Sequence, residues 1–442
     1  MNNPNAKMKH SGVEWIGDIP EGWGVLPLKY FGVITLGKML TPNEKSGYQL
    51  KPYLRSINVQ ADKINLSDVK EMWFSNDELE RLKLKRGDLL LNEGGDVGRT
   101  SIWENELDEC YFQNSINRVQ FNKEKDLYYY FYYLSQMFHF TGYYKLFVNT
   151  VSISHLTKEK LEAVKFIRPP LKEQEQIVAY LDEKTSHIDK LLDISKRKIG
   201  LLKEQRASII NQVVTKGLNP NAKMKHSGVE WIGDIPEGWG LVRLKKFGTF
   251  FKGNGIKKED LRINGIRCIR YGEIYTKYDR IVYEAKSFID DEVAKMSVLI
   301  NKGDLLFTGS GETIEDIGKA VLYFNDLIAF AGGDIIILRL NDYVDKIYSS
   351  YLINSNFVKH QKSLLGKGEI VVHIYSKDLK NIIVPLPPLE EQEQIVAYLD
   401  EKTSTIDKSI SIEERRIGLL KEYRQSIISQ VITGKIKVIA DE

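Results

Sequence analysis

Two nearly identical stretches decide how this chain folds: PPLKEQEQIVAYLDEKTSHIDK at residues 169–190 and PPLEEQEQIVAYLDEKTSTIDK at residues 387–408. Each opens on a proline pair, and proline suits the first turn of a helix because the N–H that it lacks has no partner there. Glutamates follow at once, where negative charge stabilises the positive end of the helix dipole. No further proline interrupts either stretch, so the sequence predicts long helices over residues 170–217 and 388–435.

Both predicted helices carry an apolar stripe with a period of seven, which is typical of a coiled-coil seam. The first stripe consists of Leu181, Ile188, Leu192, Ile199, Leu202, Ile209 and Val213, and the second of Leu399, Ile406, Ile410, Ile417, Leu420, Ile427 and Val431. Polar residues interrupt the stripes at matching places, namely Thr185, Ser195 and Arg206 in the first and Thr403, Glu413 and Arg424 in the second. We expect these polar positions to set the register between the helices.

The length of the helices indicates that each needs a partner. About 45 residues at 1.5 Å per residue make a rod of roughly 65 Å, which is longer than one small domain is wide. Each helix could instead cover only the domain next to it, but the seam continues too far for that alone. We therefore predict that the two helices pack against each other as an antiparallel coiled coil.

The chain is an internal duplication. Residues 3–24 recur letter for letter at 219–240, and such a repeat has to be interpreted before any local motif. The predicted order is a leader at 1–24, a globular segment at 25–169, a helix at 170–217, a second leader at 218–240, a second globular segment at 241–387, a second helix at 388–435 and a tail at 436–442. By this pseudo-twofold symmetry, the end of the second helix should approach the first leader and bring Lys435 near Asn3.

The globular segments have the pattern of a mixed α/β (α+β) fold. In the first, short strands are predicted near Leu36 and at 53–59, 88–92, 100–103 and 116–121, with a helix at about 127–147; in the second, strands are predicted at 266–271, 304–308, 320–324 and 334–340, with a helix at about 346–365. The first of these helices is rich in aromatic residues. They could stack on bases, but packing of a helix against a sheet is the more common use of such residues.

Composition excludes several classes of protein. A chain of 442 residues that is 42% hydrophobic is typical of two or three globular domains. The two cysteines, Cys110 and Cys268, lie far apart and have no metal-ligand spacing, so we expect neither a disulfide framework nor a metal site. No N-terminal signal and no long apolar run is present, which favours a cytoplasmic protein and no membrane partner. The net charge of +3 is too small to indicate nucleic-acid binding, although the globular segments are slightly basic.

No motif for catalysis survives inspection. The stretch Gly32–Lys38 resembles a phosphate-binding loop, but Met39 stands where a Ser or Thr must reach magnesium. The stretch Phe251–Gly255 fits the loose pattern of S-adenosylmethionine-binding loops, yet no Asn/Asp-Pro-Pro-aromatic motif accompanies it. No GxSxG is present. We therefore expect no catalytic residue in this chain.

The arrangement resembles the specificity subunit of type I restriction-modification enzymes over essentially the whole chain. WIGDIPEGW in the leader, GDLL in a strand and PPLxEQEQIVAYLDEKT in the helix each occur twice and in the same order. The resemblance implies two target recognition domains that each read half of a bipartite site in double-stranded DNA, and two helices that separate them and dock two modification subunits. It also implies that those subunits bind S-adenosylmethionine and methylate adenine, that motor-nuclease (restriction) subunits complete the complex, and that this chain is not an enzyme and has no cofactor.

DNA contacts are expected from polar loop residues of the two globular segments, because Arg, Lys, Asn and Gln side chains bind base edges and phosphates. The candidates are Lys38, Thr41, Lys45, Arg55, Asn58, Gln60, Arg99 and Asn114 in the first segment, and Lys252, Asn254, Lys257, Lys258, Arg267, Arg270, Tyr271, Lys319 and Lys367 in the second. The resemblance transfers none of these residues. For each of them a solvated surface role is at least as common as a DNA contact.

Two alternatives remain open at the level of sequence. The chain could be an orphan specificity subunit that works without a motor-nuclease subunit. It could also be a coiled-coil scaffold without DNA readout, which would explain the helices but not the basic loops.

Overall fold

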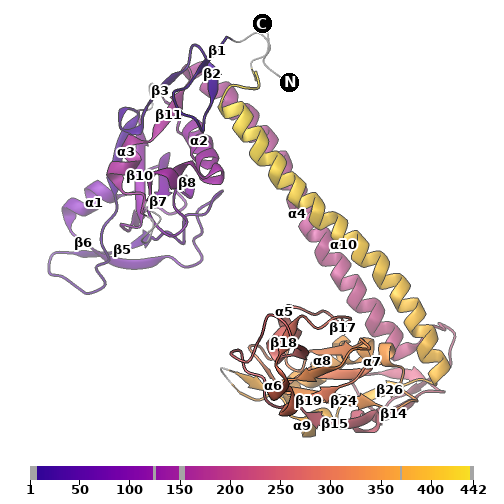
Figure 1. Ribbon diagram of the computed structural model, residues 1–442. Coiled ribbons are helices and arrows are strands. Elements are labelled where there is room, and N and C mark those ends of the chain that lie inside the picture. Colours follow the sequence, from indigo (N-terminus) through magenta and orange to yellow (C-terminus); the bar gives the residue numbers. More distant parts are fainter. Residues whose placement is uncertain (1–6, 123–125, 149–154, 369–370, 439–442) are drawn as a thin grey trace. The chain divides into compact units, whose positions relative to one another are not determined.

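The computed structural model describes residues 7–122, 126–148, 155–368 and 371–438 (Figure 1). It divides into two compact units, one of Met1–Lys196 with Arg415–Glu442 and one of Arg197–Glu414. Each unit therefore combines one globular domain with parts of both long helices. Asn3 and the last part of the predicted tail, 439–442, lie outside the described residues.

The two long helices are α4, Leu171–Lys216, and α10, Leu389–Ile432. Each begins directly after its proline pair, and the bounds agree with the predicted helices to within a few residues. Charged side chains are distributed along both helices. Accordingly, no helix in the described parts of the chain is apolar over enough of its length to cross a membrane.

A buried glutamine fixes the start of each long helix. The Gln174 amide donates to the Pro169 carbonyl at 2.9 Å, and its oxygen accepts from the Leu127 backbone N–H at 2.9 Å. Gln392 makes the equivalent two bonds in the second unit. Because one side chain satisfies backbone groups of both the helix start and the domain, the helix direction is set where it leaves the domain.

Domain 1 is built on an antiparallel sheet with the strand order β4–β10–β7–β8, formed by Gly32–Leu36, Ile116–Phe121, Asp88–Asn92 and Thr100–Trp103. A second sheet has the order β6–β5–β9, formed by Lys70–Phe74, Gln49–Leu54 and Tyr111–Phe112, with α1, Asn76–Leu82, beside it. Strand β7 is buried on both faces: Leu89 and Leu91 belong to the core that contains α2, Tyr128–Thr141, and Leu90 belongs to the core of the second sheet. This alternation explains why GDLL is part of the repeated framework.

Domain 2 repeats this plan with a sheet of order β15–β24–β20–β22–β17, formed by Gly248–Lys252, Ile335–Leu340, Asp304–Thr308, Ala320–Tyr323 and Ile281–Val282. Its second sheet has the order β18–β16–β23–β19, formed by Ser287–Ile289, Ile266–Ile269, Ala329–Ala331 and Val298–Ile300. Helices α7, Lys346–Ile353, and α8, Asn356–Leu365, take the place of α2. In β20, Leu305 and Phe307 belong to the apolar core that contains α7 and α8, and Leu306 belongs to the core of the second sheet.

Each leader folds as a hairpin, β1–β2 in the first (Met8–His10 and Asp18–Pro20) and β12–β13 in the second (Met224–His226 and Asp234–Pro236). The next strand pairs with the last strand of the same domain: β3, Gly24–Pro27, with β11, Lys165–Arg168, and β14, Gly240–Arg243, with β26, Ile383–Leu386. The two ends of each domain are thereby brought together beside the start of its long helix.

The remaining elements are short. Domain 1 contains η1, Leu28–Tyr30, η2, Tyr143–Phe147, and α3, Lys158–Ala163. Domain 2 contains η3, Leu244–Lys246, α5, Tyr271–Thr276, α6, Asp291–Lys295, β21, Ser310–Gly311, β25, Val372–His373, and α9, Ser376–Leu379.

Three predicted elements differ from the structure for local reasons. The strand expected at 53–59 ends at Leu54, because the Asn58 side chain accepts from the Arg55 N–H and turns the chain. The helix expected at 127–147 ends at Thr141, because the following Gly142, with a φ of +79°, stops the α-helix before η2. The helix expected at 346–365 is broken at Asn354, because that side chain bonds to the backbone of β22.

The end of each long helix lies against a leader. Gly434, with φ +72°, comes just after α10 and lies close to the first leader. A Cβ added there would lie 2.6 Å from Pro20 Cδ and 3.0 Å from the Trp23 ring. Gly217, with φ +73°, lies in the same way against Trp239 of the second leader. The end of the second helix therefore approaches the first leader as predicted, as far as the described residues 7–24 of that leader show.

These contacts predict opposite effects for two glycines of α10 and its cap. Gly434→Ala should lower the stability of the chain by about 1–3 kcal/mol, because the positive φ and the Pro20 ring both oppose a side chain. Gly418→Ala is the matched control, since Gly418 lies in the helix with open space around it. That substitution should stabilise the chain by about 0.5–1 kcal/mol through helix propensity. Thermal unfolding of both variants tests this, and equal shifts would contradict it.

Candidate functional site

The residues of the predicted seam are all buried or half-buried in the structure. Those that are fully buried are Leu181, Ile188, Leu192, Val213, Leu399, Ile406, Ile427 and Val431, and those that are half-buried are Ile199, Leu202, Ile209, Ile410, Ile417 and Leu420. Near each domain the stripe joins the domain core: Leu181 and Ile427 share one apolar cluster with Tyr130 of α2. Part of the stripe therefore covers the adjoining domain, an arrangement that the sequence had presented as the alternative to pairing.

Ion pairs show the relative direction of the helices within a unit. In the second unit, the Lys198 ammonium lies 2.7 Å from Glu413, and the Arg206 guanidinium lies 3.0 Å from Asp407. The partner number falls as the α4 number rises, so the two helices run antiparallel there. In the first unit, Arg424 pairs with Asp189 at 3.1 Å.

The polar seam positions Thr185 and Thr403 bond to the domains. The Tyr133 hydroxyl of α2 donates to Asp182 at 2.7 Å and lies 3.1 Å from the Thr185 hydroxyl. In domain 2, Tyr351 makes the same pair of contacts with Asp400 and Thr403, 218 residues further on, and burial raises the pKa of Tyr351 to about 12. The two threonines therefore tie each domain to the helix that follows it, which corrects the expectation that they set the register between the helices. Of the predicted polar positions, Arg206, Glu413 and Arg424 form ion pairs between the helices.

In domain 1, the structure gives most of the candidate DNA-contact residues a partner inside the domain. Two of them form ion pairs: Lys38, which is almost buried, with Glu78 at 2.6 Å, and Arg55 with Asp68 at 2.6 Å. Four donate to backbone carbonyls: Arg99 to Ser56 at 2.9 Å, Asn58 to Asn65 at 2.8 Å, Gln60 to Ile57 at 2.6 Å and Thr41 to Met39 at 3.2 Å. Lys45 is exposed, and Asn114 is half-buried. A role for these residues in DNA binding stays a prediction.

In domain 2, the structure brings four candidates together. Lys257, Lys258, Arg270 and Tyr271 line one cavity of about 360 Å³. Outside it, Lys252 and Lys367 are exposed, Asn254 donates to the Met296 carbonyl at 3.1 Å, and Arg267 lies over the Phe288 ring. Lys319 donates to the Tyr278 carbonyl at 2.8 Å, and burial lowers the pKa of its ammonium.

Strained backbone surrounds the same cavity. Ile256 has φ +51° and Asp334 has φ +61°, a conformation that is costly for any side chain and most of all for a β-branched one. Ile256 stays there because its side chain is buried beside Gly332. Such strain concentrates at binding sites, so the loop at 255–258 is the strongest candidate site of domain 2.

The sequence did not reveal a second polar cavity in this unit, of about 310 Å³, where domain 2 meets the helices. Arg206, Arg280, Lys319 and Lys362 line it, and Lys319 alone among these had been a candidate. Lys362 is buried and donates to the Gly318 carbonyl at 2.7 Å, and burial lowers the pKa of its ammonium to about 7. No sequence pattern marks Lys362, because its burial depends on the fold of α8 over the sheet.

A model of the type I restriction modification DNA specificity domain matches this chain twice, at residues 20–203 and 236–422. The chain belongs to this family. The MjaVIII specificity subunit of Methanocaldococcus jannaschii is 27% identical over 434 residues, which are 95% of this chain and 94% of that protein. The StySPI specificity subunit of Salmonella potsdam is 21% identical over 444 residues, 95% of this chain and 90% of that one.

A solved structure has the same fold. A chain from a study of complex assembly and conformational transition of the type I R-M system aligns with a TM-score of 0.72 and 18% identity, over 95% of this chain and 99% of that chain. The resemblance inferred from the repeated motifs is thus confirmed, together with the internal repeat, the mixed α/β domains and the paired long helices. This type I specificity subunit carries two DNA recognition domains.

The buried lysine of domain 2 predicts a dependence of stability on pH. The folded-state pKa of Lys362 is about 7 and lies below the unfolded value, so the unfolded chain binds more protons and stability rises as pH increases above 7. The variant Lys362→Met has no ammonium at this position, so this rise of stability with pH is absent from it. The free energy of unfolding of both proteins is measured between pH 7 and pH 10. The stability of the variant relative to the unsubstituted chain should be highest at pH 7 and should fall as the pH rises. Parallel pH profiles would refute the assignment.

Proposed function

We propose that each recognition domain reads one half of an asymmetric, bipartite DNA sequence. The observation that carries this proposal is the contrast between framework and loops in the duplication. Residues 3–24 and 219–240 are identical, and the openings of the helices at 169–190 and 387–408 nearly so, whereas the loops beside the sheets differ in sequence. Two readers with one framework and different loops would recognise two different half-sites.

The strained loop of domain 2 supports a reading role. Its cavity holds Arg270 and Tyr271 together with exposed Lys257 and Lys258. Arginine binds guanine edges with two parallel hydrogen bonds, and lysines supply phosphate contacts without sequence preference. We assign base reading to Arg270 and positioning on the phosphates to the two lysines.

Domain 1 has different chemistry at the equivalent position. Gly37 and Gly253 both follow the first strand of the main sheet, and at each a Cβ would clash with a backbone carbonyl of the facing strand or loop. The next residue is Lys38, paired with Glu78, in domain 1, and exposed Asn254 in domain 2. The equivalent loops therefore offer different donors, which is why the two half-sites should differ.

The helices would set the distance between the half-sites and dock two modification subunits, which bind S-adenosylmethionine and methylate adenine. Exposed apolar residues support this docking role. Ile194 and Leu201 of α4 are 57% and 59% exposed, and their repeat equivalents Ile412 and Leu419 of α10 are 66% and 56% exposed. Ile194 and Leu419 belong to the first unit and Leu201 and Ile412 to the second, so each unit carries one equivalent pair, and two equivalent pairs suit two copies of one partner. Restriction subunits would join that complex, and this chain would perform no catalysis.

A domain replacement tests the bipartite reading. Replacing residues 25–169 with a copy of 241–387 should convert the asymmetric site into a palindromic one, because both domains would then carry the same loops. Methylated adenines are mapped in cells that express the variant with a modification subunit. The unmodified chain in the same cells is the control, and an unchanged methylation motif after the replacement would refute the proposal.

Single substitutions in domain 2 separate phosphate contacts from base reading. Lys257→Ala should weaken binding to all sequences alike and reduce the salt slope by about one, whereas Arg270→Ala should relax discrimination at one base pair by about 1–3 kcal/mol. Lys286→Ala is the control, because Lys286 is exposed in the same domain and does not line the cavity. Binding of the assembled complex is measured on cognate and single-mismatch duplexes at several salt concentrations. If Arg270→Ala weakens binding to all sequences equally, the assignment of Arg270 to base reading is wrong.

A further inference from the structure

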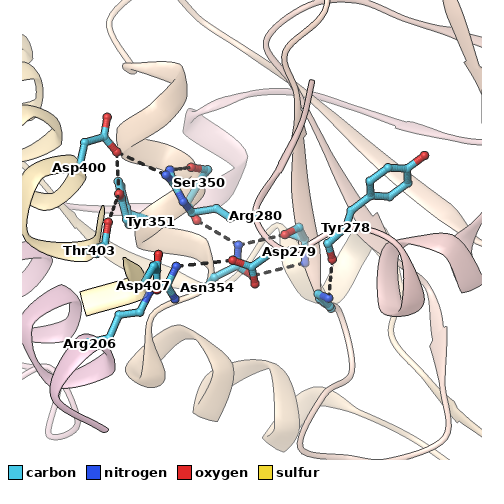
Figure 2. Close-up of polar contacts among 12 residues, drawn as sticks. Arg206, Tyr278, Asp279, Arg280, Ser350, Tyr351, Asn354, Asp400, Thr403 and Asp407 are labelled. Atoms are coloured by element: carbon cyan, nitrogen blue, oxygen red, sulfur yellow. Dashed lines mark hydrogen bonds and ion pairs between the residues drawn. The ribbon is translucent and has the colours of Figure 1, made fainter. Parts of the chain in front are cut away.

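Domain 2 is joined to both long helices by two neighbouring residues of opposite charge, Asp279 and Arg280, which follow α5 (Figure 2). Asp279 lies 3.5 Å from the Arg206 guanidinium of α4. Arg206 also lies 3.0 Å from Asp407 of α10. One guanidinium therefore connects the domain and the two helices, and its rigid planar set of donors holds both carboxylates in fixed directions.

Arg280 makes the complementary contact with the other helix. Its guanidinium lies 3.4 Å from Asp400 of α10, donates to the Ser350 hydroxyl at 2.7 Å and stacks 3.6 Å from the centre of the Tyr351 ring. The same Asp400 accepts from the Tyr351 hydroxyl. Asp279 and Arg280 thus bind opposite charges on different helices, and this pattern admits one orientation of the loop.

The duplication repeats the central part of this junction in the other unit. Arg424 and Asp189, which correspond to Arg206 and Asp407, form an ion pair at 3.1 Å. Arg424 also lies 3.5 Å from the Gln136 side chain of α2, which in turn donates to the Ala61 carbonyl. Each domain is consequently tied to its own following helix by a Tyr–Asp–Thr contact and to the helix of the other repeat by an arginine.

Polar contacts supplement the apolar packing of domain 2 on the helices at this point. Arg206, Asp279, Arg280 and Tyr351 line the cavity of about 310 Å³ described above, which lies beside the apolar cluster that Ile210 and Leu399 of the helices share with domain 2. The side chains of Arg206 and Asp407 are 26% and 50% exposed, and such pairs add little to stability. The hydrogen bonds that Arg206 donates to Asp279 and that Arg280 donates to Ser350 are directional and can nevertheless fix an angle.

We propose that Arg206 and Arg424 are positioning residues, which hold each recognition domain at a set angle on the helix pair and thereby restrict the spacer length accepted between the half-sites. The proposal rests on the bipartite reading proposed above. Because the contact to domain 2 is ionic and that to domain 1 runs through the neutral Gln136, the junction of domain 2 is the more sensitive to salt.

The test measures methylation by the full chain assembled with a modification subunit. Substrates are duplexes with the cognate site and duplexes whose spacer is one base pair longer or shorter. Arg206→Ala should raise methylation of the altered spacers relative to the cognate site by about fivefold, and Arg206→Lys should give a smaller rise. Asp279→Asn removes the domain contact alone and should act in the same direction, more weakly as salt increases. Lys203→Ala, an exposed residue of the same helix, is the matched control.

The outcomes separate the two proposals. If Arg206→Ala and Asp279→Asn lower methylation of all spacers in equal proportion, the positioning role is wrong and the junction only stabilises the fold. If Arg206→Ala does not assemble, Asp279→Asn decides, because it leaves the bridge between the helices intact. If the unsubstituted complex shows no preference for a bipartite site, the proposed function itself fails, whatever the variants do.

Discussion

Each unit of this protein depends on a leader tryptophan that lies between the start of one long helix and the end of the other. Trp23 is 3% exposed, donates its indole N–H to Glu173 in the first turn of α4 at 2.9 Å, and is in contact with Gly434 after α10. Trp239 repeats this arrangement with Glu391 at 2.8 Å and with Gly217. A buried tryptophan provides a large apolar contact, and its N–H confines it to one orientation. The two repeats are thereby linked through both helix ends, which is why leader and helix are retained together.

The buried framework leaves the recognition loops free to differ. In β7 and β20 the residues of GDLL alternate between a core shared with the helices and a core shared with the second sheet. Both faces are therefore constrained by packing, and substitutions there would create cavities or expose apolar surface. The loops at the ends of the sheets carry no such constraint. The same sheet can hold an exposed asparagine after Gly253 and a lysine–glutamate pair after Gly37 without any change in the strands.

The sequence predicted the elements that have strong periodicity and missed those that depend on a single tertiary contact. The long helices and the strands at 88–92 and 304–308 follow from proline pairs, a seven-residue period and an apolar run, all of which are local signals, and the repeat follows from identical residues at 3–24 and 219–240. The break at Asn354 was missed because it depends on hydrogen bonds to β22, which is distant in sequence. The candidate DNA contacts suffer from the same limit. Residue type suggested Lys38 and Arg55, but Glu78 and Asp68, which pair with them, adjoin them only in the folded domain.

Those internal ion pairs also bear on how the chain would bind DNA. Affinity for any sequence comes mainly from cations that replace counterions on the phosphates, and a cation already paired with a carboxylate contributes little to that exchange. Lys38, Arg55 and Arg99 of domain 1 lie beside Glu78, Asp68 and Asp96, and the net charge of the whole chain is only +3. A recognition subunit with this charge pattern would discriminate between sequences more than it would bind all of them. Under the proposed function, the modification subunits would supply the greater part of the phosphate affinity, and strong binding would require the assembled complex.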